Sequence, residues 1–118
     1  QASAAQEPEW FTTAPILAAR KVLERAGLGA DEIDLWEVNE AFAAVAMAFL
    51  RDLGLSHDAV NVRGGAVALG HPIGCSGARI LVTLLDAMRE RGARRGCAAI
   101  CLGGGEATAV VVESVAAA

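Results

Sequence analysis

Tyrosine is absent from this 118-residue sequence, and the other aromatic residues are few: two tryptophans and three phenylalanines. A protein that binds single-stranded nucleic acid by stacking its bases needs more aromatic rings than these. Positive charge is also in short supply, because ten lysines and arginines stand against fourteen acidic residues, for a formal net charge of −4. The charges are interspersed, without the basic run that would bind a membrane surface. We therefore expect neither nucleic acid nor a membrane as a partner.

Long apolar runs are missing as well. The run from Ala41 to Leu50 is well short of the ~18 residues that a membrane-spanning helix requires. The first residues lack the basic segment and apolar core of a signal peptide, so we expect a cytoplasmic protein. The three cysteines, an odd number, do not describe a disulfide framework, which favours a reducing compartment.

What the sequence does contain predicts one packed domain over residues 1–118. Hydrophobic residues make up 54% and charged residues 20%, proportions typical of a folded globular chain. Residues 1–14 show no periodicity, and we expect them to be irregular or the remnant of a first strand. Helical periodicity predicts helices over residues 15–26, 40–53 and 78–91, each ended by a glycine (Gly27, Gly54 and Gly92). Short apolar runs predict strands over residues 33–38, 60–62, 97–102 and 107–112.

This alternation predicts an α/β fold, with a mixed β-sheet and helices on its faces. The short connection between the last two strands predicts that they are antiparallel neighbours. The helix over residues 40–53 has almost no polar face, and we expect it to be buried in the core or against another domain.

Asn39 and Glu40 are the first candidate site, at the junction between a predicted strand and a predicted helix. Asn39 has two interpretations there: it caps the helix N-terminus, or it orients a water or substrate oxygen from a rigid position. The second candidate is His71, in a segment with five glycines between residues 63 and 77. Pro72 restricts the backbone of His71 towards extended conformations, and the glycines allow close approach of a ligand or another segment.

Cys101 is the third candidate, because it ends a strand just before three glycines whose N–H groups suit an oxyanion hole. Cys97 lies four residues earlier, so strict alternation places it on the same side of the sheet, where we interpret it as a small buried hydrophobe. We also expect Cys75 to be a packing residue. A zinc site made of these cysteines and a histidine is disfavoured, because no pair has the usual ligand spacing.

Together, residues 39–43 (NEAFA), 70–74 (GHPIG) and 101–105 (CLGGG) resemble the C-terminal motifs of the thiolase family. The resemblance continues through residues 20–27 and 76–80 and covers roughly residues 8–113 in the right order. It implies a thiolase-like layered fold and CoA-dependent acyl transfer, with acyl-CoA and CoA as substrates. No metal and no redox cofactor is implied.

The resemblance also implies residue roles. Cys101 corresponds to the acid/base cysteine, which takes a proton from the acetyl α-carbon in condensation or returns one in thiolysis. His71 corresponds to the histidine that activates the nucleophilic cysteine and helps to bind the thioester oxygen. Asn39 would hold the water that completes this first oxyanion hole, and the N–H of Gly103 would contribute to a second one. Next to Asn39, Ala41 and Phe42 would border the pantetheine channel.

In thiolases the nucleophilic cysteine belongs to an N-terminal half, which also carries part of the dimer interface. No cysteine precedes Cys75 here, so we expect the chain to be inactive alone. The resemblance also implies that the parent enzyme is a homodimer or homotetramer. The family's C-terminal half should begin with a strand ahead of Pro15, of which only the end fits in residues 1–9. If the missing part of that strand is central in the sheet, its loss would leave unpaired backbone groups and exposed apolar surface.

Two other interpretations stay open from the sequence. One is a non-catalytic binding or assembly module with a thiolase fold, and the other is a cysteine hydrolase that uses Cys101 with His71. Acyl-chain length and the direction of the reaction, condensation or thiolysis, also stay open.

Overall fold

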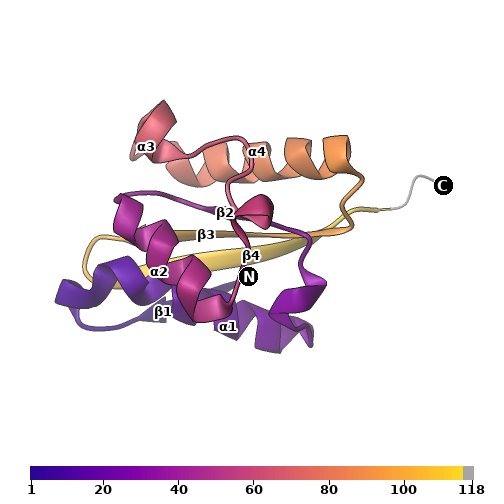
Figure 1. The fold of residues 1–118 in the computed structure, drawn as a ribbon. Coiled ribbons are helices and arrows are strands. Elements are labelled where there is room, and N and C mark those ends of the chain that lie inside the picture. Colours follow the sequence, from indigo (N-terminus) through magenta and orange to yellow (C-terminus); the bar gives the residue numbers. More distant parts are fainter. Residues whose placement is uncertain (116–118) are drawn as a thin grey trace.

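The computed structural model describes residues 1–115, which form three layers with a four-stranded sheet between helices (Figure 1). The strands are β1 (Ala2–Ala5), β2 (Leu35–Val38), β3 (Arg95–Leu102) and β4 (Glu106–Glu113). The α-helices are α1 (Ala14–Ala26), α2 (Ala43–Leu53), α3 (Ala66–Leu69) and α4 (Ser76–Arg91). The 3-10 segments η1 (Pro8–Thr13), η2 (Ala30–Glu32) and η3 (His57–Ala59) lie in the connections.

The sheet is mixed, as predicted, with the strand order β1-β4-β3-β2. β2 and β3 are parallel, whereas β3 and β4 form the predicted antiparallel pair. Of the two expectations for residues 1–14, irregular chain or the remnant of a first strand, the structure favours a strand, because β1 and η1 occupy most of that segment. β1 pairs with β4 at the edge of the sheet, so it does not take the central position considered from the sequence.

The two faces of the sheet carry separate cores. On one face, α1 and α2 cover a cluster that includes Cys97, Ala99 and Cys101 of β3. On the other face, α4 packs over a smaller cluster to which β3 contributes Ala98 (Figure 1). Cys97 and Cys101 therefore do share one side of the sheet, as strand alternation predicted.

The long helices end where the sequence indicated, at Gly27, Gly54 and Gly92. Pro15 lies in the first turn of α1, as predicted, where its missing N–H leaves no hydrogen bond unmade. No helix in the described part of the chain is both long and apolar enough to cross a membrane.

The helix over residues 40–53 is buried in the core on one side only, and its burial against another domain stays a prediction. α2 begins only at Ala43, and one side of it packs into the core through Val45 and Phe49. Met47 on the same helix is 67% exposed, because α2 rests on one face of the sheet and has no described element on its outer side. An apolar surface therefore stays open along this helix.

The segment between α2 and α4 is attached to the carboxyl end of β2. The strand predicted over residues 60–62 is reduced to a single bridge between Val60 and Trp36. Next to it, the side chain of Asn61 accepts a hydrogen bond from Val38 N (2.8 Å) and donates one to Val38 O (2.9 Å). These bonds bring the glycine-rich segment, which contains α3, to the end of the sheet.

Candidate functional site

The candidate site lies at the carboxyl ends of β2 and β3. Because these two strands are parallel, Asn39, which follows β2, and Cys101, near the end of β3, meet at the same end of the sheet. His71 reaches this place from the connection between α3 and α4. A cavity of about 330 Å³ opens here. It is lined by Phe11, Ala41, Phe42, His71, Ile73, Ile100, Cys101, Leu102 and Gly103.

Asn39 is completely buried, with 0% of its surface exposed. Its backbone N–H donates to Ala99 O (2.9 Å), and its carbonyl accepts from Ala41 N (3.0 Å), so both main-chain groups are fixed. Asn39 is not a helix cap, because Phe42 occupies the N-cap position of α2. Its side chain is instead directed to His71, with 3.4 Å between Asn39 Nδ2 and His71 Nε2.

His71 is held at both ring nitrogens. Gly70, which ends α3 with φ +94°, turns the chain in a way that a residue with a side chain rarely adopts. His71 Nδ1 then lies 2.6 Å from the hydroxyl of Ser76, at the start of α4. The Ser76 hydroxyl also donates to Pro72 O (3.1 Å), so the imidazole plane is anchored on the side away from Asn39.

The Cys101 thiol is buried at the floor of the cavity, and burial raises its pKa. It is therefore a neutral thiol at physiological pH, a form that can give up a proton to a nearby carbanion. Gly103, which lines the same cavity, opens the turn between β3 and β4. Gly105 closes this turn with φ +90°, and a Cβ there would collide with the backbone oxygen of Gln6.

The other cysteines lie outside this arrangement. Cys97 is fully buried, and burial raises its pKa to about 12, which agrees with its interpretation as a packing residue. The expectation that Cys75 is packed is wrong, because this thiol is exposed at the N-cap of α4. Within residues 1–115, no three His, Cys, Asp or Glu side chains gather as a metal ion would require.

The mouth of the cavity is apolar. Phe42 is 60% exposed and packs edge-to-face on Phe11, with 6.0 Å between ring centroids. Ile73, two residues after His71, is 85% exposed. Apolar side chains this exposed around a reactive group are typical of a surface that a ligand or another protein segment covers.

Three polar side chains next to the site were not singled out from the sequence: Ser76, Arg79 and Glu37. Arg79 NH2 donates to Asn39 Oδ1 at 3.5 Å, and Ser76 supports His71. Glu37 is 1% exposed and directly precedes Val38 and Asn39 in chain order. The sequence feature that could have indicated Glu37 is an acidic residue inside an otherwise apolar strand, because ionisable residues are seldom fully buried unless they are paired.

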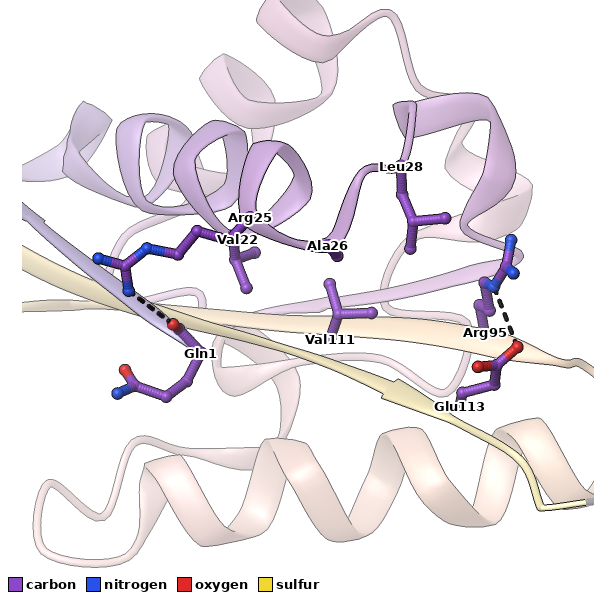
Figure 2. Close-up of a pocket in the computed structure, with 8 residues that line it drawn as sticks. All are labelled: Gln1, Val22, Arg25, Ala26, Leu28, Arg95, Val111 and Glu113. Atoms are coloured by element: carbon purple, nitrogen blue, oxygen red, sulfur yellow. Dashed lines mark hydrogen bonds and ion pairs between the residues drawn. The ribbon is translucent and has the colours of Figure 1, made fainter.

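A second cavity, of about 340 Å³, lies between α1 and the sheet, near the N-terminus (Figure 2). Arg25 donates to Gln1 O (3.0 Å) there, and Arg95 donates to Glu113 (3.3 Å). None of the residues that line it is a cysteine, histidine or serine, and its one carboxylate, Glu113, is paired with Arg94 and Arg95. The chemistry available to this chain is therefore concentrated around His71 and Cys101.

The chain is similar in sequence to known proteins of one family. The family model described as "Thiolase, C-terminal domain" matches residues 1–114. Acetyl-CoA acetyltransferase 2 of Arabidopsis thaliana is 56% identical over 93% of this chain and 27% of its own length. The acetyl-CoA acetyltransferases of Syntrophomonas wolfei and Shinella zoogloeoides are 55% and 56% identical, over 97% and 92% of this chain.

The chain spans little more than a quarter of these curated relatives, since it matches 29% of the Syntrophomonas protein and 28% of the Shinella protein. The match to the family model nevertheless extends through every helix and strand described above. The chain belongs to the thiolase family, as a thiolase C-terminal domain.

Proposed function

We propose that this chain is the C-terminal half of an acetyl-CoA acetyltransferase. Together with an N-terminal thiolase half it would condense two acetyl-CoA molecules or cleave acetoacetyl-CoA with CoA. The observation that carries the proposal is that His71 and Cys101 line one cavity while Asn39 contacts His71 Nε2. The names of the relatives favour an acetyl group over longer acyl chains.

Cys101 is the acid/base residue in this proposal. In condensation, the Cys101 thiol first gives its proton to the CoA sulfur that leaves when the nucleophilic cysteine is acetylated. The Cys101 thiolate then removes a proton from the α-carbon of a second acetyl-CoA, and the resulting carbanion attacks the acetyl group held as a thioester on the nucleophilic cysteine. A carbon–carbon bond forms and the nucleophile's sulfur leaves. In thiolysis the Cys101 thiol returns the proton to the departing acetyl-CoA carbon. A raised pKa suits this exchange, because it makes the thiolate a strong base and the thiol the resting form.

His71 acts on the nucleophile and on the substrate carbonyl. Its Nε2 accepts the proton of the nucleophilic thiol and afterwards hydrogen-bonds the thioester oxygen, with a water held by Asn39 as the second donor. The N–H of Gly103 donates a hydrogen bond to the carbonyl oxygen of the acyl-enzyme. Preorganised donors of this kind supply much of the stabilisation of enolate and tetrahedral oxyanions.

The nucleophile and the cover of the cavity come from the N-terminal half. Cys101 is the one cysteine among the residues that line the cavity, so the acyl group needs a second cysteine from elsewhere. Phe42 and Ala41 border the pantetheine arm of CoA, and the exposed Ile73 packs against the second half. The complete enzyme is a cytoplasmic homodimer or homotetramer that needs no metal or redox cofactor.

The test is CoA-dependent cleavage of acetoacetyl-CoA, measured first with the purified chain and then with the chain joined to the N-terminal half of an acetyl-CoA acetyltransferase. We expect no turnover alone and turnover when joined. Cys101→Ala and His71→Ala should each lower the joined activity by about 100-fold or more. The matched controls Cys75→Ala and His57→Ala, at residues outside the cavity lining, should retain it.

Turnover by the chain alone would contradict the need for a second half. A joined protein that is folded, binds CoA and stays silent would instead favour the non-catalytic binding module.

A further inference from the structure

The hydrogen bonds around Asn39 have a single consistent direction, and Arg79 sets it. A guanidinium can only donate, so the Asn39 atom that faces Arg79 NH2 has to be the amide oxygen. The amide nitrogen of Asn39 therefore faces His71 Nε2, 3.4 Å away. An amide NH2 group also only donates, so Nε2 has to accept.

The same reasoning continues through the imidazole ring. A neutral histidine that accepts at Nε2 carries its proton on Nδ1. His71 Nδ1 then donates to the Ser76 hydroxyl (2.6 Å), and this hydroxyl donates in turn to Pro72 O (3.1 Å). The opposite tautomer is disfavoured, because a proton on His71 Nε2 would face the Asn39 amide NH2, donor against donor.

On its buried side, Arg79 has Glu37 as a charged neighbour, without a hydrogen bond between them. Its Nε and NH1 atoms, and both carboxyl oxygens of Glu37, are buried without a hydrogen-bond partner among residues 1–115. Leu35 faces α4, so by strand alternation Glu37 faces α4 too, and Arg79 lies on that helix. Burial raises the pKa of the Glu37 carboxyl and the charge of Arg79 partly opposes this rise, so the two side chains interact electrostatically.

We propose that Arg79 is a positioning residue that orients the Asn39 amide and thereby holds His71 in the tautomer with an unprotonated Nε2. That nitrogen is the one that faces Asn39 and carries the lone pair that a general base needs. The catalytic consequence rests on the proposed function, whereas the orientation and the tautomer are properties of this chain and are measurable without any activity.

The direct test is the tautomer of His71 by NMR. The chain contains two histidines, His57 and His71, so selective ¹⁵N labelling of imidazoles gives two spin systems. At about pH 8, where an unperturbed imidazole is neutral, we expect His71 to be protonated at Nδ1. His57, which lies in the exposed segment η3, serves as the internal reference. A wild-type His71 protonated at Nε2 would overturn the proposal without any variant.

Variants of Arg79 test the cause. Arg79→Met removes the donor and should shift the imidazole ¹⁵N signals of His71 towards those of His57, whereas Arg79→Lys should keep the wild-type tautomer. If Arg79→Met does not fold, Arg79→Gln is measured, since its amide can either donate or accept and should give mixed tautomers. Unchanged His71 signals in a folded Met or Gln variant would refute the role of Arg79.

Kinetics of the joined enzyme supply the second measurement. Arg79→Met should lower kcat by at least about tenfold and leave KM for acetoacetyl-CoA within about twofold, with partial recovery in Arg79→Lys. The control is Arg89→Met, since Arg89 is exposed on the same helix and pairs with Asp86 at 2.7 Å. An inactive wild-type joined enzyme would refute the proposed function alone, because the tautomer measurement would still stand. Normal kcat in Arg79→Met, with the wild-type enzyme active, would refute the positioning role.

Discussion

The hydroxyl of Ser76 lies 2.6 Å from Nδ1 of His71, five positions along the chain and at the first residue of α4. Ser76 is fully buried, whereas His71 is exposed, so the fixed partner of the pair is the serine. Its backbone N–H and its hydroxyl both bond to Pro72 O, which closes the loop between the two residues. The orientation of the imidazole ring is thus tied to the beginning of a helix.

Removal of the Ser76 hydroxyl should release the imidazole ring. We expect Ser76→Ala to lower kcat of the joined enzyme by about tenfold and to cost roughly 1–3 kcal/mol in stability, because a buried group loses its partner. Steady-state thiolysis and urea unfolding measure the two effects. The control is Ser56→Ala, which removes the cap that accepts Asp58 N (3.2 Å) and should cost about 1 kcal/mol with no change in kcat. Equal activity of the two variants would contradict the prediction.

Glu37 should make the stability of the chain fall as the pH rises. Burial raises the pKa of its carboxyl from 4.5 to about 7, against the opposing charges of Arg79 and Arg63 and with the help of Glu40. Between these values the folded chain keeps a proton that the unfolded chain releases. The free energy of unfolding should therefore drop by about 3 kcal/mol across the interval, and lower pH should restore it.

Glu37→Gln removes this titration. Urea unfolding at about pH 4.5 and pH 8 should show a smaller loss of stability with rising pH in the variant than in the wild type. The control Glu24→Gln, at an exposed position of α1, should keep the wild-type dependence of the free energy of unfolding on pH. If the stability of Glu37→Gln depends on pH as strongly as that of the wild type, this carboxyl is not the titrating group.

The three cysteines should react with iodoacetamide at three different rates. Cys75 is exposed and should be alkylated first, whereas burial raises the pKa of Cys101 and should slow its reaction. Cys97, with a pKa of about 12 and no exposed surface, should react only in unfolded chains. A time course near pH 8, read by mass spectrometry of peptides, gives the order. Cys97 labelled as fast as Cys75 would contradict the structure.

Gly105→Ala should destabilise the chain by more than about 1 kcal/mol. The residue has φ +90°, and its Cβ would meet the backbone oxygen of Gln6 and so separate the β3–β4 turn from the end of β1. Gly77→Ala is the matched control, because a Cβ at this position of α4 meets nothing within 4 Å and should leave stability equal or higher. Thermal unfolding of both variants decides the matter, and similar melting temperatures would refute the assigned contact.

The sequence predicted the helix ends, the mixed sheet and the antiparallel pair because these depend on local signals: glycine after a periodic run, and a short connection between apolar strands. The motifs around Asn39, His71 and Cys101 located the site through family resemblance. The structure brings His71 and Cys101 to one cavity and places Asn39 against His71. Their catalytic roles stay predictions until the joined enzyme is assayed.

The contacts that hold the site residues in place were not predicted, because they join residues far apart in sequence. Arg79 reaches Asn39 across forty positions, and although it lies in the family-like segment 76–80, the sequence does not indicate this contact. The exposure of Met47 fits one of the two predictions for its helix, burial against another domain, which periodicity alone could not separate from burial in this chain's own core. The N-cap interpretation of Asn39 failed because α2 begins later than its apolar run.

The pairing of β1 with β4 has a consequence for how the chain folds. Ala2 lies opposite Ala109, so the first strand finds its partner only after nearly all the intervening chain has been brought into place. The entropy lost in closing so long a loop slows the step and has to be recovered by the contacts that follow. β3, β4 and α4 form from neighbouring residues and can assemble early, whereas β1 docks late. Refolding should therefore restore α4 and the β3–β4 hairpin before the hydrogen bond from Gln6 N to Gly105 O forms.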